Sequence, residues 1–191
     1  MGKGRLEAFS DAVIAIIITI MVLELKVPHG DNLAALRQLI PVFLSYMLSF
    51  IYLGIYWNNH HHLLQAVRHV NGSVLWANLN LLFCLSLIPF VTGWMGENYF
   101  ATLPVALYGI VLLCSAIAYF ILTRVLIASH GKDSALAIAL AEDFKDKVSL
   151  FIYAVAIGFS FVNSWFACIL YTLVAVMWLI PDRRIEKTLT R

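Results

Sequence analysis

Long runs without a charged residue dominate the pattern of the chain. Asp, Glu, Lys and Arg are all absent from residues 38–67, 69–96, 98–123 and 148–181. A helix needs about 20 apolar residues to cross the hydrocarbon of a bilayer, so each of the first three runs predicts one membrane span. The fourth run is too long for one span, and Asn163-Ser164 at its centre predicts two shorter helices joined by a turn.

A less obvious span precedes these runs. Residues 12–23 are uncharged but lie between Asp11 and Glu24. They would rise about 18 Å as a helix, well short of the ~30 Å hydrocarbon core. A span over residues 6–27 therefore keeps Asp11 within or near the hydrocarbon, where a carboxylate costs about 2.5–3.5 kcal/mol unless protein or water surrounds it. We expect the other helices to shield this first helix, which is the candidate pore helix.

The pattern as a whole predicts an all-α membrane protein with one domain over residues 1–191. Six spans put both termini on one side of the membrane. That side then holds all of the 13 Lys and Arg residues except Lys26 and Arg37, and an excess of positive charge marks the cytoplasm. The loop 131–147 mixes apolar and charged residues and predicts a short interfacial helix on the cytoplasmic face. The expected spans are 6–27, 38–62, 73–95, 103–127, 146–163 and 165–181.

Composition removes several classes of function. The chain is 62% hydrophobic and 13% charged, which is too apolar for an ordinary soluble domain. Its net charge of +2 comes from scattered residues, so we expect no binding of nucleic acid. The three cysteines lie in apolar runs, where packing is their usual role. The sequence contains no phosphate-binding loop, zinc-protease motif or supported Ser–His–Asp set, so we expect no catalytic residues, no cofactor and no enzyme activity.

An apolar stripe runs along the first helix. At about 100° per residue, one face collects Phe9, Ile16, Ile20, Leu23 and Val27. Thr19 lies at the edge of this stripe, and Asp11 lies on the opposite side of the helix. The stripe fits a pore lining, but it also fits a packing seam between helices. Periodicity alone favours the seam, because branched apolar residues at this spacing usually pack against a neighbour.

Polar residues of the second and third spans are candidate partners for Asp11. Trp57, His60 and His61 share one helical face. The run His60-His61-His62 also suggests a metal site, but adjacent side chains point about 100° apart and no carboxylate or cysteine is near in sequence, so we expect no metal. Asn78 lies in the third span, where asparagine often forms a hydrogen bond between helices, and that simpler interpretation stays open.

A series of motifs resembles the transmembrane protein 175 family of potassium channels. The motifs occur in order over nearly the whole chain: Arg5-x-x-x-Phe9-Ser10-Asp11, Ala15-Ile16, Thr19, Leu23-Glu24, Tyr56-Trp57, His60-His61, Leu75-Trp76-Ala77-Asn78-Leu79, Leu87-Ile88-Pro89-Phe90 and Ile180-Pro181-Asp182-Arg183-Arg184. One six-span unit without a second copy resembles the bacterial members of that family.

The resemblance implies a homotetramer in which four first helices surround a potassium pore in a bacterial plasma membrane. Its partners would be its own copies, K⁺ and membrane lipids. The implied constriction is formed by Ile16, Ile20 and Leu23, with Thr19 contributing to potassium preference. Ile20 stands where many members have leucine. The resemblance also implies a polar network that holds helices and subunits together, formed by Arg5, Phe9, Ser10, Asp11, Trp57, His60, His61 and Asn78.

Two points stay open at this stage. The run of histidines leaves the partner of Asp11 ambiguous between His60 and His61. An ion-coupled or proton-coupled transporter, in which Asp11 would load the ion, is the alternative to a channel.

Overall fold

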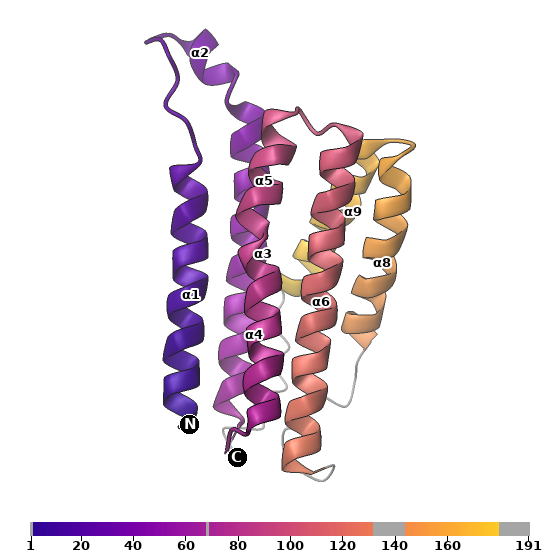
Figure 1. The fold of residues 1–191 in the computed structure, drawn as a ribbon. Helices are drawn as coiled ribbons and strands as arrows, with labels where there is room; N and C mark the ends of the chain where they lie inside the picture. Colours follow the sequence, from indigo (N-terminus) through magenta and orange to yellow (C-terminus); the bar gives the residue numbers. More distant parts are fainter. Residues whose placement is uncertain (1, 68, 132–143, 180–191) are drawn as a thin grey trace.

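The computed structural model describes residues 2–67, 69–131 and 144–179, and the regular elements in these ranges are helices. Figure 1 shows the long helices side by side, with successive passes running in opposite directions. The short helix α2 lies in the connection between the first two passes. In chain order the helices are α1 (Lys3–Leu23), α2 (Leu33–Arg37), α3 (Ile40–Gln65), α4 (Gly72–Ser86), α5 (Ile88–Glu97), α6 (Thr102–His130), α8 (Phe144–Ser160) and α9 (Ser164–Leu179).

Four passes are long and apolar enough to cross a membrane. They are α1, α3, α6 and the consecutive pair α4–α5 over Gly72–Glu97. The remaining passes, α8 and α9, have 17 and 16 residues. The helical passes therefore lie where six spans were expected, and four of them have the length and hydropathy of a span. The spanning of α8 and α9 stays a prediction.

The turn expected in the last apolar run is present. It separates α8 from α9 at the predicted Asn163-Ser164 position. The Asn163 side chain accepts hydrogen bonds from the backbone N–H of Trp165 at 3.0 Å and of Phe166 at 3.3 Å. These bonds satisfy N–H groups that have no partner within the helix, which explains why α9 begins at this asparagine.

Two boundaries differ from the prediction. α1 ends at Leu23, so Val27 lies beyond the helix and does not belong to its stripe. Pro28 prevents the helix from continuing through Val27, because it restricts the residue before it and has no N–H to donate to the carbonyl oxygen of Glu24. The third pass is interrupted at Leu87, where Pro89 occupies the first turn of α5 and supplies no N–H to continue α4. The expected interfacial helix falls mostly on residues 132–143, which lie outside the described residues.

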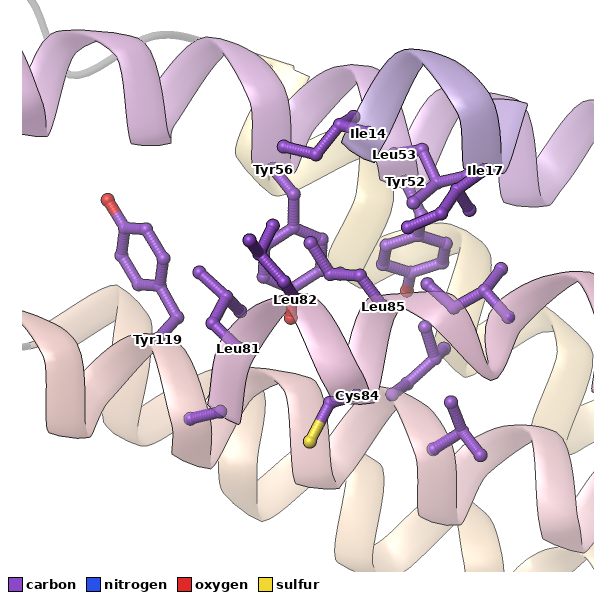
Figure 2. Packing of buried hydrophobic residues seen from close by; sticks show 14 of the residues in the cluster. Ile14, Ile17, Tyr52, Leu53, Tyr56, Leu81, Leu82, Cys84, Leu85 and Tyr119 are labelled. Carbon is purple, nitrogen blue, oxygen red and sulfur yellow. The ribbon is translucent and has the colours of Figure 1, made fainter. Parts of the chain in front are cut away.

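Helix α6 packs against α4, α5, α8 and α9, and α1 stands at one edge of the bundle (Figure 1). Figure 2 shows Ile14 and Ile17 of α1 meeting leucines of α4 and tyrosines of α3. Shielding of α1 by the other helices is therefore correct for one face only. That buried face consists of Leu6, Ser10, Ile14, Ile17 and Met21.

A glycine lets two helices approach closely on the other side of the bundle. Gly109 of α6 lies against Tyr171 of α9, and a Cβ atom at Gly109 would overlap the tyrosine hydroxyl. That hydroxyl donates a hydrogen bond to the carbonyl oxygen of Val105 at 3.2 Å, which fixes the ring in place. The contact joins α9 to α6 at a position where a larger side chain has no room.

Candidate functional site: the first helix and its polar contacts

The outward face of α1 carries an open apolar row. Ile16 is 56% exposed, Ile20 42% and Leu23 80%, although all three are large hydrophobic residues. Thr19 is exposed in the same row, and its hydroxyl donates to the carbonyl oxygen of Ile16 at 2.9 Å. The Thr19 oxygen keeps its lone pairs available on the outward face. One chain therefore leaves this row uncovered while it buries the opposite face of the helix.

A groove lies beside this row. It has a volume of about 630 Å³ between α1 and α5 and is lined by Ile16 and Ile20 on one side and by Phe90 and Trp94 on the other. Phe90 is 66% exposed. The apolar surface of α1 thus continues onto α5, which gives one chain an apolar face far wider than a single helix.

A chain of hydrogen bonds ties the buried face of α1 to α3 and α4. The Ser10 hydroxyl donates to the carbonyl oxygen of Leu6 at 2.8 Å and accepts from the Asn78 side-chain amide at 2.9 Å. The Asn78 oxygen then faces Nε2 of His60 at 2.7 Å, so that nitrogen must carry the hydrogen. The other ring nitrogen of His60, Nδ1, is buried and has no hydrogen-bond partner among the described residues. His60 is thus held as one defined neutral tautomer.

A second polar cluster lies next to this chain. The Trp57 indole donates to the Asp11 carboxylate at 3.0 Å and stacks on the His61 ring, with centroids 6.1 Å apart. Nδ1 of His61 lies 3.2 Å from the Glu7 carboxylate. The Gln65 amide nitrogen, 2.8 Å from Nε2 of His61, can only donate, so the ring hydrogen sits on Nδ1 and points at Glu7. These contacts bind the first turns of α1 to the end of α3.

The structure brings together most of the residues suggested for a polar network, but in two clusters. His60 belongs with Ser10 and Asn78, and His61 belongs with Trp57 and Asp11. Neither histidine forms a hydrogen bond with Asp11, whose partner is Trp57. Two further members lie outside both clusters: Phe9 is 46% exposed, and Arg5 makes no ion pair with any residue in the described part of the chain.

Sequence reasoning missed Glu7, Gln65 and Lys3. Glu7 contacts His61, and the Lys3 ammonium donates to the carbonyl oxygen of Gln65 at 2.8 Å. The signal was present, because Lys3, Glu7 and Asp11 follow one another at intervals of four and so share one face of α1. Among the described residues, no group of His, Cys, Asp and Glu side chains could hold a metal ion.

Comparison with known proteins shows which family has this sequence pattern. Residues 5–89 match the family described as the endosomal/lysosomal potassium channel TMEM175. A potassium channel of Chryseobacterium sp. (strain P1-3) is 59% identical over 189 residues, covering 99% of this chain and 98% of that protein. The chain belongs to the TMEM175 family. The resemblance inferred from the motifs is confirmed, and the family together with the apolar helices identifies an integral membrane protein.

A solved TMEM175 relative has the same fold. The crystal structure of a lysosomal potassium-selective channel TMEM175 homolog from Chamaesiphon minutus superposes with a TM-score of 0.82 at 28% identity, over 94% of this chain and 97% of that one. The human TMEM175 relative carries a different name, endosomal/lysosomal proton channel. It is 37% identical over 105 residues, which cover 49% of this chain and 20% of the human protein.

Proposed function

We propose that the chain is one subunit of a potassium-selective channel in which four copies of α1 surround a pore. The observation that carries this proposal is the apolar row of Ile16, Ile20 and Leu23, uncovered on a helix that buries its opposite face. Copies of the chain that bring these rows together around one axis would cover them by closed symmetry, and four copies give a ring. The names of the bacterial relatives support potassium as the permeant ion.

The proposed constriction works by dehydration. Rings of Ile16, Ile20 and Leu23 offer an ion no side-chain oxygen to replace lost water, so a narrow ring excludes water and ions together. A wider arrangement of the same rings lets K⁺ pass. Thr19 places the nearest hydroxyl oxygen beside this path, and we assign the potassium preference to it. The proposal requires no cofactor.

The polar clusters have a separate proposed role. They lie on the side of α1 that faces α3 and α4, away from the exposed row, so they hold the helix rather than contact the ion. The orientation follows the distribution of Lys and Arg, with both termini in the cytoplasm and the protein in a bacterial plasma membrane among its lipids.

The test is the reversal potential of purified protein in a planar bilayer, with K⁺ on one side and Na⁺ on the other. We expect a potassium-selective potential and unitary current steps. Ile16→Asn wets the ring in every subunit, so it should raise conductance and weaken the preference for K⁺. Thr19→Ala should reduce the preference with little change in stability.

Helix α9 offers a matched control pair at the same spacing. Ile169 of α9 is 55% exposed and Ile16 of α1 is 56% exposed. The hydroxyl of the exposed Thr172 donates to a carbonyl oxygen of the preceding turn, as the hydroxyl of Thr19 does in α1. We expect Ile169→Asn and Thr172→Ala to leave permeation unchanged. If the variants of α1 behave like those of α9, α1 does not line the pore. A monomer with intact flux in mild detergent would contradict the tetramer.

A second candidate function is proton conduction, favoured by the name of the human relative. The two functions differ in one measurement. With equal K⁺ on both sides and a pH difference, a proton channel gives a reversal potential that follows the pH difference, whereas a potassium channel gives zero. Absence of unitary steps in both conditions would favour a coupled transporter instead.

A further inference from the structure

A second cavity lies inside the bundle where α3, α6, α8 and α9 meet. Its walls include Tyr52 and Tyr56 of α3, Tyr119 of α6, Tyr153 of α8 and Trp178 of α9. No wall residue belongs to α1, so this cavity is separate from the apolar row and from the polar clusters. It has no part in the proposed conduction path.

Aromatic rings from four helices form this cavity. The Tyr56 and Tyr119 rings meet edge-on with centroids 6.1 Å apart, and the Tyr52 and Tyr153 rings are 6.4 Å apart at 51°. Figure 2 shows Tyr52 and Tyr56 together on α3 and Tyr119 across from them. The faces of such rings carry partial negative charge, and ammonium groups bind to them.

The α8 and α9 wall adds a carboxylate and an indole. Asp146, in the first turn of α8, lines the cavity together with Trp178. The Trp178 indole donates to the Ser149 hydroxyl at 2.8 Å, which fixes the ring. The Lys145 ammonium lies 5.8 Å from the centre of that ring. The Trp178 ring thus already binds one ammonium group, from a residue that does not line the cavity.

Not every tyrosine hydroxyl of the cavity is bonded to another described residue. The Tyr52 hydroxyl donates to the carbonyl oxygen of Tyr171 at 2.6 Å, and the Tyr119 hydroxyl donates to that of Asn59 at 3.4 Å. Tyr56 is only 9% exposed, and its hydroxyl has no hydrogen-bond partner within residues 2–67, 69–131 and 144–179. The Tyr56 hydroxyl can therefore donate to or accept from a ligand or water in the cavity.

We propose that this cavity binds a compact organic cation of the alkylammonium class, with its alkyl groups against the tyrosine rings and its charge toward Asp146. The available space fits this class. The centres of water-sized spheres can occupy about 40 Å³, and one water needs about 10–15 Å³ by this measure. The cavity therefore holds a body about as large as three water molecules, which suits tetramethylammonium and excludes long alkyl chains.

The experiment measures binding of tetramethylammonium to the purified full chain in detergent, by calorimetry and by the shift in melting temperature at constant ionic strength. We expect a saturable shift. Uncharged tert-butanol, which has nearly the same shape, should give none at equal concentration. Asp146→Asn should weaken binding about fivefold or more, because it removes the carboxylate charge beside the aromatic wall.

A cavity-filling variant separates this site from the pore. Ala116 of α6 lines the cavity, so Ala116→Leu should abolish the shift, whereas Ala154→Leu, at an exposed position on α8, should not. If tetramethylammonium still binds Ala116→Leu with unchanged affinity, it binds elsewhere and the proposal is wrong. An equal shift with tert-butanol would also overturn it, since the cavity would then recognise shape alone. If Ala116→Leu does not fold, Asp146→Asn decides, because unchanged affinity there contradicts the proposal.

Discussion

Replacing Asn78 by leucine removes the centre of the hydrogen-bond chain that ties α1 to α3 and α4, while it keeps a side chain of similar size. Asn78 is fully buried and joins Ser10 at 2.9 Å to His60 at 2.7 Å. Asn80, two residues along the same helix, is exposed and points to a different side. Asn80→Leu is therefore the matched control for the change in polarity and helix propensity.

The expected loss of folding stability depends on which hydrogen bonds Ser10 and His60 keep when Asn78 is replaced. A hydrogen bond between helices in a bilayer is worth about 0.6 kcal/mol on average and ~1.7 kcal/mol at most. Ser10 keeps its hydrogen bond to the carbonyl oxygen of Leu6, so losing the bond from Asn78 should cost near the average. Within the described part of the chain Nδ1 of His60 has no partner, so the substitution would leave neither ring nitrogen bonded. The loss of the His60 bond should therefore be near the maximum. The sum is about 2 kcal/mol.

Thermal unfolding of the purified protein checks this value. A loss of about 2 kcal/mol lowers the Tm by roughly 4–8 °C in a chain of this size. The K⁺/Na⁺ reversal potential of the folded fraction should not change, because Asn78 faces away from the exposed row of α1. The reasoning is refuted if Asn78→Leu melts within a degree of Asn80→Leu. It is also refuted if selectivity changes while the Tm does not.

Two further predictions concern packing and pH. Gly109→Ala should destabilise the protein by about 1–3 kcal/mol, because its Cβ would overlap the hydroxyl of Tyr171. Gly158→Ala is the control, since a Cβ at that position meets nothing within 4 Å. Equal melting temperatures of the two variants would contradict the close contact. The hydrogen bond and charge of Glu97 raise the pKa of Lys26. This ion pair therefore stabilises the fold fully below the ordinary lysine pKa of about 10.4. Its contribution to stability is lost as the pH rises through the higher pKa of the folded protein. The small difference in Tm between wild type and Lys26→Gln should be constant from pH 7 to 9 and vanish above that pKa, and a difference that grows with pH would disprove the pairing.

The sequence predicted helix positions well where the signal was local. Runs without charge predicted α3 and α6, and the polar pair at Asn163 predicted the turn between α8 and α9. The end of α1 was predicted too late, although Pro28 in the sequence marks it. The interruption at Leu87 also has a local cause in Pro89, but a helix can accommodate a proline by kinking, so the residue alone did not distinguish a kink from a break.

The candidate site was less predictable because it depends on how helices rotate against one another. Helical spacing placed His60 and His61 on the same side of α3, facing the first helix. A difference of about 100° between neighbours then sends His60 to Asn78 and His61 to Glu7. That choice is made by the packing of α1 against both α3 and α4, which no local pattern contains. The apolar row of α1 was visible in the sequence. Whether neighbouring helices cover that row depends on how the bundle packs, and the structure shows that they leave it exposed.

The position of α1 at the edge of the bundle also affects how the protein is made. The ribosome completes Trp57 46 residues after Asp11, and Asn78 68 residues after Ser10. At about 5–20 residues per second, these partners arrive about 2–9 s and 3–14 s later. During that interval Asp11 has no indole to bind, at a cost of about 2.5–3.5 kcal/mol if it lies in lipid. The first helix therefore gains the partner of Asp11 only when the second pass has been synthesised, and the partner of Ser10 only with the third.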